Sequence, residues 1–169
     1  MVNKKMTSRM LSLLALFSAL SAVGAAIKIP AIVGSVAFDV FPALIAAALL
    51  GGGAGAIVGV LGHLLSALIA GFPLGPMHAL IAIEMAILVW MFALVFKKGK
   101  KTTASIMFIL ANAFIAPLPF IFLMNPAFYL AIVPSLIIGS IINTGIALVA
   151  IPRLRFLVSQ ERIKRDIKL

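Results

Sequence analysis

The chain has 169 residues, of which 64% are hydrophobic and only 11% are charged, and its mean hydropathy is +1.26. An ordinary soluble domain is about half apolar and about a quarter charged. One small core cannot bury this excess of apolar surface, so lipid must cover much of the protein. The composition excludes an ordinary soluble domain, and the lack of cysteine excludes disulfides and thiolate metal sites.

The formal net charge of +10 would suggest a nucleic-acid partner if the protein were soluble. Its basic residues, however, collect in three short clusters, within residues 4–9, 97–101 and 153–168. Short basic segments beside apolar runs are the pattern of the positive-inside rule. We therefore expect membrane lipid, and no nucleic acid, next to these charges.

Apolar runs of about 17–25 residues, broken by Gly, Pro or charge, predict transmembrane helices. In chain order, the expected helices cover residues 8–27, 40–51, 54–70, 76–96, 102–123 and 126–152. The second is short, with Pro42 in its first turn. The basic tail 153–169 is either an amphipathic stretch on the membrane surface or an unordered end. The sequence thus predicts an all-α integral membrane protein, one domain over residues 1–169 with six transmembrane helices in one bundle.

The basic clusters also predict the orientation of these helices. An even number of spans places both termini and all three clusters on one side, which the positive-inside rule identifies as the cytoplasm. The Gly71–Pro76 hairpin and Asp39 then lie at the outer face, together with Lys28 and the segment 117–126.

His63, His78 and Glu84 flank the Gly71–Pro76 hairpin. An ionisable group in hydrocarbon costs several kcal/mol unless it faces protein or water, so each is a candidate for ligand binding. His63 and Glu84 each lie about eight residues from the hairpin, which places both about 12 Å below the outer boundary on adjacent helices. The alternatives are a structural latch, with His63 and Glu84 paired only with each other, and an interfacial role for His78.

His63 shares a stripe of small residues with Gly55, Gly59 and Ala67 at i, i+4 spacing. Helices approach each other closely along such stripes. We therefore expect His63 to face the bundle and not the lipid.

Other polar and aromatic candidates lie near the outer face. Asp39 is either a ligand contact or the N-cap of the helix at 40–51. Asn112, near the Pro-interrupted end of its helix, favours ligand contact, whereas the deeper Asn143 favours helix packing. The aromatic candidates for stacking on a planar ligand include Phe72 and Tyr129, with the aromatic belt or the core as their alternative.

Motifs for catalysis or ATP hydrolysis are missing from the sequence. It contains no HExxH, no GxSxG and no GxxxxGK[ST]. We therefore expect no enzyme, and any ATP chemistry that drives transport must belong to another chain.

Four stretches of the sequence resemble a known family. They are ALFSA at 15–19, FDVFPA at 38–43, GVLGHLLS at 59–66 and GFPLG at 71–75. With six expected spans and a short second helix, the chain is similar to the substrate-binding S components of bacterial energy-coupling factor (ECF) vitamin transporters. The last three stretches resemble the branch assigned to alpha-ribazole, the nucleoside precursor of the cobalamin lower ligand.

The resemblance implies a binding subunit in the bacterial cytoplasmic membrane, which takes its vitamin from outside beneath loops that close over it. It implies docking through the small residues Ala15, Ala19 and Ala22 on a transmembrane coupling subunit. Two ATPase subunits complete such a transporter and use the ATP, so this chain needs no cofactor of its own.

A nucleoside ligand would place matching demands on the site. Ribose hydroxyls would use Asp39, Glu84 and Asn112 as acceptors, and an unprotonated base nitrogen would need a donor from His63 or His78. Phe38, Phe72 and Tyr129 would form walls for the aromatic ring.

Other functions stay open at this point. A stand-alone proton-coupled carrier would use Glu84 and His63 as its proton relay. An S component for pantothenate or cobalamin would share the same scaffold. An intramembrane enzyme would need a nucleophile constellation, which the sequence lacks. A structural subunit would hold His63 and Glu84 paired with each other.

Overall fold

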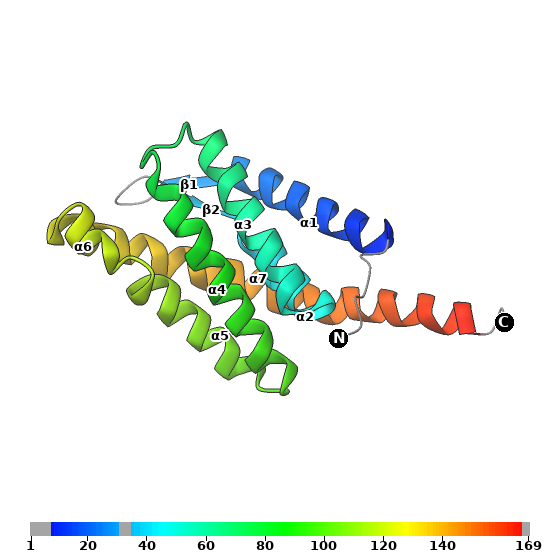
Figure 1. Cartoon of the computed structure of the whole chain (residues 1–169). Coiled ribbons are helices and arrows are strands. Elements are labelled where there is room, and N and C mark those ends of the chain that lie inside the picture. Colours follow the sequence, from blue (N-terminus) through cyan, green and yellow to red (C-terminus); the bar gives the residue numbers. More distant parts are fainter. Residues whose placement is uncertain (1–7, 31–34, 167–169) are drawn as a thin grey trace, which may run out of the picture.

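A computed structural model describes residues 8–30 and 35–166 of the chain, so the expected basic residues Lys4 and Lys5 lie outside the described residues. The elements lie side by side in an elongated helical bundle (Figure 1). In chain order they are α1 (Ser8–Ala26), β1 (Lys28–Pro30), β2 (Ser35–Ala37), α2 (Phe41–Leu50), α3 (Gly52–Ile69), α4 (Met77–Lys97), α5 (Lys101–Leu110), the π-helix η1 (Ala111–Ile115), α6 (Pro119–Leu123) and α7 (Pro126–Asp166).

Five helical segments of the described chain are long and apolar enough to cross a membrane. They cover Ser8–Ala26, Gly52–Ile69, Met77–Lys97, Lys101–Leu123 and Pro126–Arg155. The sixth expected span, α2, has only 10 residues. At 1.5 Å per residue it extends about 15 Å, roughly half of the hydrocarbon thickness. The structure therefore supports five full spans and one short apolar helix.

The expected helix over 102–123 is divided into α5, η1 and α6. In η1 the amide of Ala116 bonds the carbonyl of Ala111 at 2.9 Å, one residue further back than in an α-helix. Pro117 and Pro119 follow directly and have no N–H to continue the α-helical ladder, so the helix widens and then restarts.

The prediction that the last helix ends near 152 is wrong, because α7 continues through Pro134 and Pro152 to Asp166. Each proline removes one backbone hydrogen bond, which a long apolar helix with packed neighbours tolerates. The segment beyond Pro152 is rich in Leu, Arg, Gln, Glu and Lys, which favour helix.

The segment between the first two helices holds strands that an all-α prediction missed. β1 and β2 pair antiparallel, with Lys28 opposite Ala37 and Pro30 opposite Ser35. Three residues per strand are too few to give a clear alternating pattern in the sequence. This small hairpin carries the chain from the end of α1 to the start of α2.

Two glycines allow α1 to lie close to its neighbours. A Cβ at Gly24 would overlap the backbone carbonyl of Phe38, and one at Gly62 would lie 2.8 Å from the Ser21 side chain. Only glycine permits these approaches. They hold the segment before α2 against the bundle.

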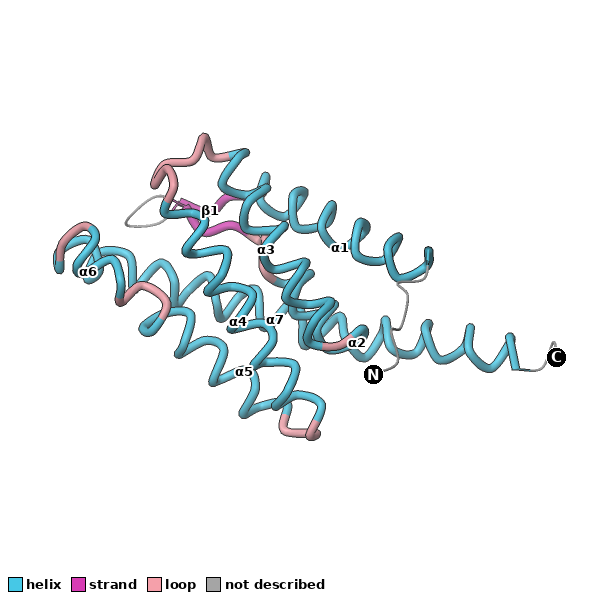
Figure 2. The backbone as a smooth tube through the Cα atoms, viewed as in Figure 1, coloured by secondary structure: helices cyan, strands magenta, loops and turns pink. Residues whose placement is uncertain are grey.

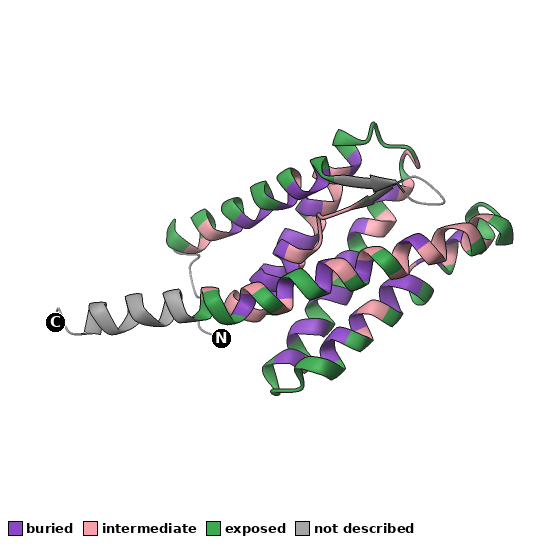
Figure 3. Cartoon of the chain, turned by 180° about the vertical axis from the view of Figure 1, so that it is seen from behind, coloured by how far each residue is buried: buried purple, intermediate pink, exposed green. Residues whose placement is uncertain are grey.

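The pattern of burial is that of a protein surrounded by lipid. Residues such as Leu44, Val58, Phe92 and Phe108 form the buried core. Large apolar side chains also cover the outside of the helices, as for Phe122 at 90% exposure. Figure 3 shows buried and exposed residues alternating along the helices, with exposed faces turned outward.

Candidate functional site

A cavity of about 530 Å³ lies inside the bundle, close to the loop that joins α3 to α4. Its walls come from helices α3 to α7 with η1, from the residues between β2 and α2, and from the loop residues Pro73 and Leu74. Figure 2 shows this loop and the loops around α6 at the end of the bundle opposite the two termini. The volume falls within the range of roughly 300–1,000 Å³ typical of small-molecule sites.

Five of the eight proposed ligand-binding residues line this cavity: Asp39, His63, His78, Glu84 and Asn112. The stripe that contains Gly55, Gly59 and Ala67 is buried, so His63 faces the bundle as expected.

The two histidines contact each other across the α3–α4 interface. His63 Nε2 lies 3.1 Å from His78 Nδ1, and the two rings are tilted by 38°. The second nitrogen of His78, Nε2, accepts a hydrogen bond of 3.3 Å from the backbone N–H of Leu74 in the loop. The polar side chains of α3 and α4 are thus connected to the loop above the cavity.

The proposed latch between His63 and Glu84 is not formed, since His63 pairs with His78 instead. Glu84 Oε2 is buried and has no hydrogen-bond partner within the described residues. A second cavity residue, Ser135 on α7, has a buried hydroxyl that also lacks a partner there. Unpaired buried polar atoms are costly, so these two oxygens on residues of the cavity wall are candidates for ligand contact.

On the opposite wall the amide side chains are bonded to the protein. Asn112 Nδ2 donates to Ser140 Oγ at 2.7 Å. Asn143 Oδ1 accepts from the backbone N–H groups of Val40 (3.1 Å) and Phe41 (2.9 Å). Its Nδ2 donates to the carbonyls of Ala37 (2.9 Å) and Gly139 (3.0 Å).

Asn143 therefore caps α2 from a helix about a hundred residues away in the sequence. The alternative that Asp39 caps α2 is wrong, because the N-cap residue is Val40 and no side chain of its own segment bonds the first turn. Asp39 lies before α2, outside the long helices, and is one of the residues that line the cavity. Burial raises the pKa of its carboxyl above the ordinary value, and a hydrogen bond with Ser66 opposes that shift.

The three aromatic candidates lie outside the cavity wall. Phe72 is 40% exposed in the loop and meets the His78 ring edge-on, with ring centroids 5.6 Å apart. Tyr129 donates its hydroxyl hydrogen to the carbonyl of Phe114 at 3.2 Å. Phe38 bonds through its backbone N–H to the carbonyl of Gly24 at 3.1 Å. The aromatic wall of the cavity comes instead from Phe108, Phe120 and Phe128.

Sequence reasoning missed Ser66, Ser135 and Ser140 on the cavity wall. Serine is common in membrane helices, where it usually bonds its own backbone. The sequence offers one sign of them: Ser135 and Ser140 lie near Gly139 on the helix that also carries Asn143. This spacing is equally compatible with ligand contact and with helix packing.

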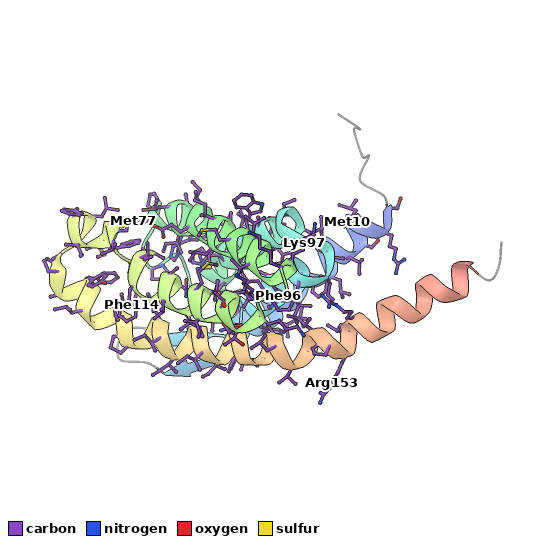
Figure 4. All side chains as sticks on the ribbon, turned by 90° about the horizontal axis from the view of Figure 1, so that it is seen from below. Met10, Met77, Phe96, Lys97, Phe114 and Arg153 are labelled. Carbon is purple, nitrogen blue, oxygen red and sulfur yellow. The ribbon has the colours of Figure 1, made fainter. Side chains whose placement is uncertain are left out.

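The cavity and the basic residues Lys97 and Arg153 lie toward opposite ends of the bundle. Figure 4 shows Met77, at the start of α4, and Phe114 toward one end, and Met10, Lys97 and Arg153 toward the other. The loop beside Met77 covers the cavity. A binding site at one end and positive charge at the other is the arrangement expected for a site that opens away from the cytoplasm.

One face of α1 is unoccupied by the rest of the described chain. Leu14, Phe17 and Ser21 are buried against the bundle. Ala15 and Ala19 are exposed, and Ala22 is half-buried. The three alanines thus lie on or beside a free face of the helix.

Comparison with protein-family models gives a match over most of the chain. The model described as "ECF transporter, substrate-specific component" matches residues 9–157. The chain belongs to this family. Proteins of the family are multi-pass proteins of the cytoplasmic membrane that bind solutes for transport rather than catalyse reactions, and they associate with a membrane coupling component and ATPases.

This S component also has the fold of a solved structure titled "Structure and mechanism of the S component of a bacterial ECF transporter". The two chains are 20% identical with a TM-score of 0.71, and the match covers 89% of this chain and 97% of the other. A search among curated proteins found no significant match.

Proposed function

We propose that this S component is the high-affinity binding subunit for uptake of a vitamin or vitamin precursor, and that its ligand is alpha-ribazole. The observation that carries the proposal is the cavity beside the α3–α4 loop, whose lining residues include polar atoms without a partner in the described parts of the chain. The resemblance of residues 38–43, 59–66 and 71–75 to the alpha-ribazole branch supports the choice of ligand.

The chemistry of the wall suits a nucleoside with an apolar base. Glu84 Oε2 and Ser135 Oγ would offer hydrogen bonds to ribose hydroxyls, and Asp39 and Asn112 also line the cavity. His63 would bond the unprotonated nitrogen of the base. The dimethylbenzimidazole ring would pack on Met85, Phe108 and Phe120. Because Phe38, Phe72 and Tyr129 do not line the cavity, we propose no direct ring contact for them in this conformation.

We further propose that both termini lie in the cytoplasm, with the short helix α2 completing a six-helix arrangement. The position of Lys97 and Arg153 away from the cavity supports this orientation (Figure 4). The exposed side of Ala15 and Ala19 would allow close contact with the coupling subunit of the transporter. Two partner ATPases would then supply the energy, and no cofactor is proposed for this chain.

Calorimetry on the full chain in lipid nanodiscs tests the ligand. We expect one molecule of alpha-ribazole to bind per chain. Pantothenate and cobalamin should bind with much lower affinity. His63→Ala and Glu84→Ala should each weaken binding, whereas Ile87→Ala, on the exposed side of the same helix as Glu84, should leave it unchanged. Tight binding of pantothenate or cobalamin instead would replace the proposed ligand and keep the family function.

Transport assays in proteoliposomes separate this function from a proton-coupled carrier. We expect the chain alone to bind alpha-ribazole without accumulating it, and uptake to require the coupling subunit, the ATPases and ATP. Uptake by the chain alone under a pH gradient would contradict the proposal.

A further inference from the structure

We propose that His78 is a positioning residue which, together with the Leu74 backbone, fixes His63 as a hydrogen-bond donor toward the ligand. The cavity would therefore select a ligand that presents a hydrogen-bond acceptor, such as an unprotonated ring nitrogen or a carbonyl, at His63. The identity of that ligand rests on the proposed function, but the state of the two histidines does not.

The loop between α3 and α4 defines the protonation of His78. The backbone N–H of Leu74 can only donate, and it points at His78 Nε2 from 3.3 Å. Nε2 must therefore carry no proton. A neutral imidazole has one N–H, so the proton of His78 lies on Nδ1. Turning the ring over would place carbon atoms at both contacts, so the two hydrogen bonds together define the ring orientation.

The second step passes from His78 to His63. Since His78 Nδ1 carries the proton, it donates across 3.1 Å to His63 Nε2. His63 Nε2 is then the acceptor, and the proton of His63 lies on its own Nδ1. That nitrogen forms no hydrogen bond within the described part of the chain. Because His63 lines the cavity, we assign this N–H to the ligand site.

The reverse direction is excluded by proton count. If His63 donated from Nε2, His78 would have to accept at both nitrogens and would be an anion. Protonation of either histidine would turn an accepting nitrogen into a donor and bring two N–H groups face to face. The other titratable side chains on the same wall are the acids Asp39 and Glu84, and neither bonds a histidine within the described residues.

The two hydrogen bonds from Leu74 to His78 and from His78 to His63, here called the relay, connect the loop to the ligand site. His78 is only 7% exposed and packs against the Phe72 ring, so the loop residues hold the ring on two sides. Without the Leu74 N–H, His78 Nε2 would no longer be held as an acceptor, and His63 would lose its fixed donor state. The position of Leu74 in the loop therefore sets the hydrogen-bonding character of His63.

Nitrogen NMR of the histidine-labelled full chain in nanodiscs at neutral pH tests the relay without any ligand. The chain has only two histidines, so His78→Asn suffices to assign the signals. We expect both rings to be neutral and protonated at Nδ1, the minor form of a free histidine side chain. A ring protonated at Nε2, on either residue, would overturn the proposal.

A matched pair of variants tests the positioning role with alpha-ribazole as the probe. In His78→Asn the side-chain amide occupies the place of Nδ1 and keeps the donor to His63, whereas His78→Gln reaches the place of Nε2 and keeps only the acceptor for Leu74. We expect affinity within about twofold of the parent for Asn and about tenfold weaker binding for Gln. Equal losses in both variants would overturn a positioning role.

The two experiments fail separately. If the NMR tautomers are as expected but alpha-ribazole does not bind, the proposed ligand is wrong and the relay stands. If alpha-ribazole binds but a ring carries its proton on Nε2, the relay is wrong and the binding function stands. Should His78→Gln not fold, the NMR spectrum of the parent chain still decides.

Discussion

The two walls of the cavity carry similar numbers of polar side chains but use them differently. On the η1 and α7 side, Asn112 and Asn143 bond other parts of the protein. On the α3 and α4 side, one buried oxygen of Glu84 and one nitrogen of His63 have no hydrogen-bond partner among the described residues. Within the described chain, the amide side chains of the η1 and α7 wall are bonded to the protein, whereas the α3 and α4 wall keeps side-chain atoms that a ligand would have to bond.

The α7 wall has one exception, and it sharpens the comparison. Ser135 is buried to 6% exposure, yet its hydroxyl has no partner within the described residues. It lies on the same helix as Ser140, whose hydroxyl accepts the bond from Asn112. Substitutions on the two walls should therefore separate into effects on stability and effects on binding.

The largest effect is expected from Asn143→Ala. The variant removes the acceptor of the Val40 and Phe41 amides and the donor to Ala37, leaving partly buried backbone groups before and at the start of α2 without these bonds. We expect a loss of about 2–4 kcal/mol in the free energy of unfolding. Denaturation of the detergent-solubilised protein measures it.

The matched control for Asn143 is Asn125→Ala. Asn125 also bonds a helix-start amide, that of Phe128 at 2.8 Å, but at an exposed site and within its own segment. Its loss should cost about 1 kcal/mol. Equal stability of the two variants would show that the long-range cap of α2 contributes little.

The next largest effect is expected from Glu84→Gln. The amide keeps the size of the side chain but replaces one carboxyl oxygen by a donor, so the ligand loses one acceptor. We expect alpha-ribazole to bind about tenfold more weakly, with a thermal midpoint close to that of the parent. Calorimetry and thermal denaturation of the same preparation measure both. A large loss of stability with unchanged affinity would place Glu84 with the architectural residues.

Much of the fold was predictable because long apolar runs leave few alternatives. The starts of α1 and α4 lie within one residue of expectation, since charge or Gly/Pro marks these boundaries. The end of α7 and the π-helix were not predictable, because proline tolerance depends on the packing around it. The short strands carry no periodic signal at all.

The candidate site was predictable in position but not in bonding. Rarity of ionisable groups in apolar segments pointed to His63 and Glu84, and both line the cavity. Their depths suggested a pair, but the helix rotations bring His63 to His78 instead. In the sequence, Asn143 and Ser135 are both polar residues on one apolar helix. Only the three-dimensional contacts show that Asn143 caps α2 and that the Ser135 hydroxyl has no partner within the described residues.

The smallest effect is expected from Ser135→Ala, which tests the exception on the α7 wall. The hydroxyl makes no bond to the described chain, so its removal should leave the free energy of unfolding unchanged or slightly raised. A neutral hydrogen bond to a ribose hydroxyl is worth about 1 kcal/mol, so affinity for alpha-ribazole should fall about fivefold. Ser140→Ala is the control. It breaks the 2.7 Å bond to Asn112, so its main effect should be a lower free energy of unfolding rather than a lower affinity. If Ser135→Ala lowers stability as much as Ser140→Ala and leaves affinity unchanged, the whole α7 wall is architectural and the ligand is bound from the α3–α4 side alone.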